Sequence, residues 1–326
     1  MSVLCSGSYL VDCIVLDLPR IGCPGTLTYA PEGIHIFPGG HSANVSICLC
    51  RLNQENVNSV GCTGKDLWHD YVYEELIKEG VKVHKCQTEG TTAKNIALVV
   101  KGEDRRFIAE LTSNSELPLR LVKDLIEEIT PTIFYQGTVG GLTYIDPKLN
   151  ELLTHARSQR CLTFVDVITP VNSWEHLHAG LNEMDFLHCN IEEGYALSGL
   201  SDPLDVAKYL VKKGVGVALV SRGRGGAVLG NKSFTVSMPA FKAIQVDPTG
   251  AGDAFCAGII RELMKVKSFG IIEIEGSINI LLNAQAVGAA CITSYGASTG
   301  VNKDRVDKLI TSQGEKIIDQ TIIELQ

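Results

Sequence analysis

The chain has 326 residues, of which 45% are hydrophobic and 20% are charged, a composition typical of a soluble globular protein. It exceeds the ~250–300 residues at which one hydrophobic core usually stops growing, so we expect one large α/β domain with a small appended piece. The net charge of −8 provides no basic excess to hold phosphates along a groove, which argues against nucleic acid or an anionic membrane as a partner.

The cysteines and the N-terminus indicate a reducing, cytoplasmic location. The chain has 11 cysteines, an odd number, and no Cys-x-x-Cys, so neither a disulfide framework nor a zinc site is indicated. Most lie in apolar segments, where reduced thiols behave as small hydrophobes; these include Cys5, Cys62, Cys161, Cys189 and Cys291. The N-terminus has no basic leader and is interrupted by Asp12, and no segment offers the ~20 apolar residues of a spanning helix.

Short apolar segments alternate with amphipathic ones along most of the chain. Apolar segments that predict strands lie at 2–7, 56–64, 132–137, 161–167, 185–190 and 215–223. Helical spacing occurs at 42–53, 66–80, 117–129, 146–159 and 202–214. This alternation predicts a mostly parallel central sheet with helices on both faces, and such sheets bind ligands at the carboxyl ends of their strands.

Two segments break this rhythm and predict a small second sheet. Residues 12–38 are rich in Pro, Gly and β-formers, and residues 90–110 predict a hairpin that turns at Lys101–Asp104. We expect these two segments to form a β lid over the site, and the core to comprise 1–11, 39–89 and 111–326. Two exposed edge hairpins are the alternative interpretation.

The stretch DPTGAGDAF places a carboxylate behind a glycine-rich turn that opens a helix. Gly250 and Gly252 can adopt backbone angles closed to other residues, and the amides of Gly250, Ala251 and Gly252 at a helix N-terminus form an anion hole. Asp253 alone would be explained by the preference of acidic residues for helix N-termini. A phosphate in the hole and a hydroxyl that gives its proton to Asp253 explain both features, which favours phosphoryl transfer with a general base.

These residues carry a resemblance to a known family. The stretch DPTGAGDAF resembles the C-terminal signature of the ribokinase family, the PfkB-type carbohydrate kinases, and PGGHSANVSICLCRL at 38–52 resembles its N-terminal signature. The similarity extends over nearly the whole chain in family order. It implies a ribokinase-like fold and an ATP-dependent kinase that transfers the γ-phosphate to a hydroxyl of a small sugar or polyol, with Asp253 as base.

The resemblance also implies an acceptor site near the lid. The segment GSYLVD resembles the first strand of the family, so that Asp12 would bind sugar hydroxyls. Gly39 and Gly40 would let backbone approach the acceptor closely, and the Asn44 side chain can both donate and accept. From the residues alone, Asp12 also suits a surface strand end, and Asn44 suits an ordinary helix start.

The resemblance further implies a nucleotide site with its own ions. The resemblance implies that Asn190, Ser221, Gly223, Gly226, Asn283 and Gly296 contact ATP. Glu193, in a motif that resembles Asn-x-x-Glu, would hold Mg²⁺ through water, and Asp247 and Thr249 are candidates for K⁺. A plain hairpin turn at 223–226 and a helix-dipole role for Glu193 are the structural alternatives.

The acceptor is left open. His41 and Ser42 follow Gly39-Gly40 where ribokinase-like members often have Lys-Gly, so ribose is not indicated over other polyols. A nucleoside kinase of the same fold and a non-catalytic sugar or nucleotide sensor are alternatives. Family analogy also suggests a homodimer through the lid.

Overall fold

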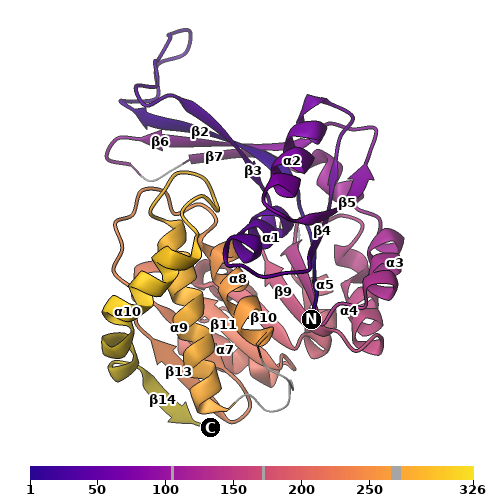
Figure 1. Cartoon of the computed structure of the whole chain (residues 1–326), viewed down its shortest axis with the longest axis vertical. Coiled ribbons are helices and arrows are strands. Elements are labelled where there is room, and N and C mark those ends of the chain that lie inside the picture. The colour runs from indigo at the N-terminus through magenta and orange to yellow at the C-terminus, as the bar shows by residue number, and fades with distance from the viewer. Residues whose placement is uncertain (104–105, 171–172, 266–272) are drawn as a thin grey trace.

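The apolar segments form the centre of one large sheet in the computed structural model, which describes residues 1–103, 106–170, 173–265 and 273–326 (Figure 1). The strand order across the described part of this sheet is β14-β13-β12-β11-β10-β9-β8-β1-β4-β5. Its strands are β1 (Val3–Ser6), β4 (Val57–Thr63), β5 (Lys82–Gln87), β8 (Ile133–Val139), β9 (Leu162–Val167), β10 (Phe186–Asn190), β11 (Val217–Ser221), β12 (Ala227–Gly230), β13 (Phe234–Met238) and β14 (Ile322–Leu325). Pairing is parallel from β5 to β11 and antiparallel from β11 to β14. All residues of β1, β4, β8 and β9 are buried, as the apolar segments predict for a covered parallel sheet.

Helices cover both faces of this sheet, as the alternation predicts. The helices are α1 (His41–Arg51), α2 (Leu67–Lys78), α3 (Leu119–Ile129), α4 (Leu149–Ser158), α5 (Glu175–Gly180), α6 (Ile191–Ser198), α7 (Pro203–Lys212), α8 (Ala251–Leu263), α9 (Ile274–Cys291) and α10 (Lys303–Asp319), with 3₁₀ turns at Thr112–Glu116, Asp146–Lys148, Leu181–Glu183 and Gly223–Gly225. One core cluster joins α1, α8, α9 and α10 to one face of the sheet. A second joins α3 to α7 to the other face.

Helices α8 and α9 pack unusually closely because a glycine lies at their contact. A Cβ atom on Gly258 would lie 2.6 Å from the Cα atom of Ala284, so only glycine allows this approach. Most residues of α9 are buried, and the polar residues Glu275, Asn279 and Asn283 follow one another at helical spacing. In the described parts of the chain, no helix has the length and apolar content needed to cross a membrane.

The two segments that break the rhythm pair with each other in a second sheet. Its strands, in the order β3-β2-β6-β7, are β2 (Leu10–Leu18), β3 (Ile34–Gly39), β6 (Ala93–Val100) and β7 (Arg106–Glu110). The predicted hairpin is present as the antiparallel pair β6–β7, although Asp104 in its turn lies outside the described residues. Because β2 and β6 pair in parallel, the two segments form one sheet rather than separate hairpins. This sheet projects beyond one end of the large sheet (Figure 1).

The prediction that the thiols are reduced is wrong for one pair. The structure joins Cys62 and Cys86 in a disulfide, and nine other cysteines are free. The two residues are direct partners on the neighbouring parallel strands β4 and β5, with Cα atoms 4.7 Å apart. Their sequence separation of 24 residues gives no sign of this proximity, because only strand register creates it.

We expect Gly258→Ala to lower the free energy of unfolding by roughly 1–3 kcal/mol, because the new methyl group must push the two helix backbones apart. Gly314→Ala is the matched control inside α10, where the nearest atom to a new Cβ is a side-chain carbon 3.4 Å away. The control should be neutral or stabilising, since alanine favours helices over glycine by ~1 kcal/mol. Urea unfolding of both variants tests this, and equal effects would contradict it.

Candidate active site

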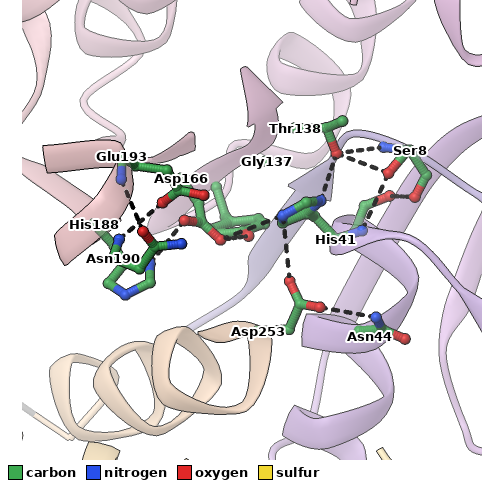
Figure 2. Close-up of polar contacts among 12 residues, drawn as sticks. Ser8, His41, Asn44, Gly137, Thr138, Asp166, His188, Asn190, Glu193 and Asp253 are labelled. Atoms are coloured by element: carbon green, nitrogen blue, oxygen red, sulfur yellow. Dashed lines mark hydrogen bonds and ion pairs between the residues drawn. The ribbon is translucent and has the colours of Figure 1, made fainter. Parts of the chain in front are cut away.

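Side chains from both halves of the chain meet where the parallel strands end (Figure 2). Thr138, Asp166 and Asn190 lie at or near the carboxyl ends of β8, β9 and β10. His41 begins α1, and Asp253 lies in the first turn of α8. A parallel sheet gathers these positions at one edge, as predicted for its binding site.

The glycine-rich turn leads into α8 with Gly250 in a left-handed conformation and no side-chain cap. Gly250, the N-cap of α8, has φ 73°, and a Cβ there would lie 2.3 Å from the Ala297 carbonyl oxygen. No side chain caps α8, although the Ala251 amide donates to the Pro248 carbonyl at 3.3 Å. A helix N-terminus of this kind, with its positive dipole end, suits a phosphate.

Asp253 is a buried carboxylate in which one oxygen atom is hydrogen-bonded and the other is not. Asn44 Nδ2 donates to Oδ2 of Asp253 at 2.8 Å, which brings together two residues 209 positions apart in sequence. The Oδ1 atom is buried and has no hydrogen-bond partner among the described residues. Burial raises the pKa of Asp253, while His41 and the Asn44 hydrogen bond oppose the rise.

His41 lies between two of the buried carboxylates. Its Nε2 atom is 3.9 Å from Asp253 Oδ1 and 4.0 Å from Asp166 Oδ2. Its Nδ1 atom hydrogen-bonds Thr138 Oγ1 at 2.8 Å. Burial lowers the pKa of His41, but Asp253, Asp166 and Glu193 outweigh burial and raise it above its ordinary value.

Asp166 anchors a second histidine beneath the anion hole. Its Oδ1 atom is 2.7 Å from His188 Nδ1, and its Oδ2 atom accepts from the Tyr135 hydroxyl at 3.0 Å. His188 Nε2 in turn lies 3.1 Å from Ser221 Oγ at the end of β11. Burial opposes ionisation of Asp166, yet His188 lowers its pKa, and Asp166 likewise raises the pKa of buried His188. The pair lies close to Gly252, where a Cβ would lie 3.5 Å from His188 Cε1.

Glu193 and Asn190 form the start of α6. The Asn190 side chain accepts from the Glu193 amide, and Glu193 Oε2 accepts from the Asn190 amide, a reciprocal capping box with both distances 2.8 Å. Burial and the nearby Asp166 charge raise the pKa of Glu193 to about 7. Oxygen atoms whose charge is poorly compensated suit a hard cation, so these residues fit Mg²⁺.

Asp12 projects from the second sheet toward the same place. Asn95 Nδ2 donates to Asp12 Oδ1 at 2.8 Å, and burial raises the pKa of Asp12 to about 6 despite that hydrogen bond. A Cβ on Gly39 would lie 2.2 Å from Asp12 Oδ2, and one on Gly40 would lie 2.3 Å from the Ser8 carbonyl oxygen. Close approach to Asp12 and to the Ser8 backbone therefore requires glycine at both positions, and their predicted contact with an acceptor stays a prediction.

Asp247 fixes the loop that supports the anion hole. It accepts from the amide and hydroxyl of Thr249 at 3.0 and 2.7 Å, and from the Gly296 amide at 3.1 Å. Gly296, with φ 86°, contacts the ring of Phe37 from β3: a Cβ would lie 2.9 Å from that ring. The second sheet therefore touches the loop beside the predicted K⁺ site.

Two of the predicted nucleotide contacts lie in a turn between antiparallel strands, and a third lies elsewhere. Gly223 and Gly226 have φ values of 53° and 93° in the turn that connects β11 to β12, and their contact with ATP stays a prediction. Asn283 donates to the Asn279 carbonyl of its own helix α9, beside Gly258 rather than Asp253. Gln285 is buried and reaches the Met238 carbonyl, which would lie 2.0 Å from a Cβ on Gly226.

Sequence reasoning missed His41, Asp166 and His188 as members of one site. Asp166 and His188 lie side by side because they are opposite each other on the neighbouring strands β9 and β10. His41 approaches them from the start of α1. A histidine directly after Gly-Gly at a helix start, and an Asp and a His each near the end of a strand, were the available signals.

Comparison with known proteins identifies the family. The family model of the pfkB family carbohydrate kinase matches residues 1–304, so the chain belongs to this family, whose members transfer phosphate to an alcohol group. Aminoimidazole riboside kinase of Salmonella typhimurium is 28% identical over 276 residues, covering 81% of this chain and 84% of that protein. Probable fructokinase-5 of Arabidopsis thaliana is 26% identical over 277 residues, covering 80% and 83%.

A solved structure confirms the predicted fold. The crystal structure of a putative ribokinase II from Escherichia coli, in complex with ATP and Mg²⁺, aligns with a TM-score of 0.76 at 21% identity. The alignment covers 95% of this chain and 99% of that one. The ribokinase-like fold, with its large mostly parallel sheet and separate small sheet, is as expected from the sequence.

We expect Asn44→Ala to raise the pKa of Asp253 further, because the variant removes a hydrogen bond that stabilises the charged carboxylate. Titration of the carboxyl carbons by NMR, with Asp253→Asn used for assignment, measures the shift. Asn58→Ala is the control: Asn58 is also buried but bonds the Val3 and Asn56 carbonyls. An Asp253 pKa that is unchanged in Asn44→Ala would show that this hydrogen bond is not formed.

Proposed function

We propose that this chain is an ATP-dependent kinase that transfers the γ-phosphate to a hydroxyl of a small sugar or polyol, with Asp253 as general base. The observation that carries the proposal is the unbonded Oδ1 atom of Asp253, buried beside a helix N-terminus that suits a phosphate. An acceptor hydroxyl would bond to this oxygen and give it its proton. The Gly250–Gly252 segment would stabilise negative charge on the group in transfer.

The surrounding residues divide into an acceptor side and a nucleotide side. Asp12, Gly39, Gly40 and Asn44 would bind the acceptor. Asn190, Ser221, Gly223, Gly226 and Gly296 would contact ATP, with Gln285 a better placed neighbour of that turn than Asn283. The raised pKa values of Asp253 and Asp12 fit a site that is completed by ligands able to donate hydrogen bonds.

Metal ions would balance the negative charge on the nucleotide side. Glu193, with Asn190 beside it, would hold Mg²⁺ through water, and the bound ion would neutralise phosphate oxygens. The ATP and Mg²⁺ named for the Escherichia coli structure support this assignment. Asp247 and Thr249 would place K⁺ against the loop that contacts Gly250 through Ala297.

The acceptor is best described as uncharged. Lys94, the basic residue next to the Asp12–Asn95 pair, is engaged by Glu110 and by the Thr92 carbonyl. A carboxylate such as Asp12 suits paired hydroxyls and repels a phosphosugar. A nucleoside is the second candidate, because a relative is named aminoimidazole riboside kinase.

We expect Asp253→Asn to reduce phosphoryl transfer by at least ~10²-fold while ATP still binds, because the amide cannot accept the hydroxyl proton. An ADP-release screen over sugars, inositols and nucleosides, with and without K⁺, identifies the acceptor and gives the rate of the variant. Calorimetry with Mg-ATP measures binding. Full turnover by Asp253→Asn would refute the mechanism, and binding without ADP release from any acceptor would favour a non-catalytic sensor.

We further propose a homodimer through the second sheet. Ile36, Cys13, Ile96 and Ile108 are paired in one row across its four strands, and Ile36, Ile96 and Ile108 are exposed. Because neighbouring residues of a strand point to opposite faces, this row lies on the side opposite Asp12. An apolar row across a small sheet suits a self-complementary interface.

We expect Ile108→Glu to shift the protein from dimer to monomer in sedimentation velocity, because it places a charge in that row. Ile318→Glu, at an exposed position of helix α10, is the control and should leave the assembly unchanged. A wild-type protein that sediments as a monomer would contradict the proposal.

A further inference from the structure

One basic side chain lies between the acceptor side and the nucleotide side of the site. His41 Nε2 is 3.9 Å from Asp253 Oδ1, where the acceptor would bond, and 4.0 Å from Asp166, which adjoins the nucleotide side through His188 and Ser221. Both separations are too long for a hydrogen bond. Nε2 therefore bonds neither carboxylate, and Figure 2 shows it directed at Asp253.

The contacts of His41 determine which of its ring nitrogens faces Asp253. Thr138 Oγ1, the partner of Nδ1, also lies 2.7 Å from Ser8 Oγ and accepts from the Ser8 amide. Nε2 faces two carboxylate oxygens, which would repel a lone pair. Nε2 therefore carries a proton in both the neutral and the charged ring, and His41 presents an N–H donor beside Asp253 Oδ1.

The ring is held rigidly in this position. The His41 amide donates to Ser8 Oγ at 3.2 Å, and Gly40 before it has φ 96°. A Cβ on Gly137 would lie 2.6 Å from His41 Cβ, so glycine at position 137 makes room for the side chain. Rigid placement of a donor removes the cost of reorganising it during reaction.

The charges around His41 favour its protonated form. Three carboxylates face it from three elements: Asp253 on α8, Asp166 on β9 and Glu193 on α6. His188 on β10 opposes them, but less strongly, and the other direct contacts, Thr138 and Ser8, are neutral. Together these groups raise the pKa of His41 above its ordinary value.

From this geometry we infer that His41 is a catalytic residue of the proposed transfer, an imidazolium whose Nε2–H donates to a non-bridging oxygen of the phosphoryl group as it crosses from ATP to the acceptor. The acceptor oxygen forms the new bond to phosphorus and loses its proton to Asp253 Oδ1. The bond from phosphorus to the bridging oxygen breaks, and ADP keeps that electron pair. His41 keeps its proton throughout and stabilises the charge in transfer.

Kinetics of His41 variants test the inference, which rests on the proposed function. With the best acceptor from the screen, we expect His41→Gln to lower kcat by roughly 10²-fold with little change in either KM, because the contact exists mainly in the transition state. Wild-type kcat should fall as pH rises through the His41 pKa, and this alkaline loss should be absent in His41→Gln. His84→Gln, at a β5 histidine bonded to Asn58, is the control and should behave as wild type.

Labelled-histidine NMR provides a readout that needs no acceptor. We expect the His41 pKa to rise further when ADP, Mg²⁺ and aluminium fluoride, a mimic of the phosphoryl group, are added, while that of His84 does not change. An unchanged His41 pKa, or a wild-type kcat and pH profile in His41→Gln, would overturn the inference. If Asp253→Asn alone retained full activity, the proposed base would fail, whereas failure of the His41 tests leaves that base intact.

Discussion

The structure depends on gathering negative charge in one buried place. Asp253, Asp166, Glu193 and Asp12 come from four elements and meet at the carboxyl edge, where burial opposes their ionisation. Of these four, only Asp166 has a lowered pKa, because the ring of His188 is in direct contact with it. The other three keep raised pKa values, which is the electrostatic state of a site prepared for cations and hydroxyl donors.

Close backbone approach makes this gathering possible. The Asp12 carboxylate occupies the space that a side chain at Gly39 would fill, and the loop at Ala297 occupies the space beside Gly250. Glycine at these positions brings the second sheet and α8 within reach of one small ligand. The proposed acceptor site would therefore be shared between two sheets, because Asp12 and Asn95 belong to the smaller sheet and Asp253 lies on α8, which packs on the larger one. The contact of Phe37 with Gly296 adds a second connection between them.

Much of the fold follows from local patterns. The segments predicted as strands and helices each overlap the corresponding element, since covered parallel strands need continuous apolar runs and their helices need one apolar face. The glycine turn with Asp253 also reads directly from sequence, because backbone freedom, helix dipole and carboxylate are adjacent there. Contacts between residues far apart in the sequence could not be predicted from local patterns. His188 bonds Asp166 on the neighbouring strand, and the Cys62–Cys86 disulfide depends on the register of β4 and β5.

The sequence by itself determined the alternation of strands and helices, the glycine-rich turn and the carboxylate beside it, because each of these is encoded within a few consecutive residues. Only the tertiary structure decided which groups compensate that carboxylate. Asn44 lies 209 positions from Asp253, and His41 reaches both Asp253 and Asp166 only after α1, α8 and β9 have packed. The physical reason is that charge compensation acts through distances of a few ångströms in space, and these distances leave no periodic or local trace along the chain.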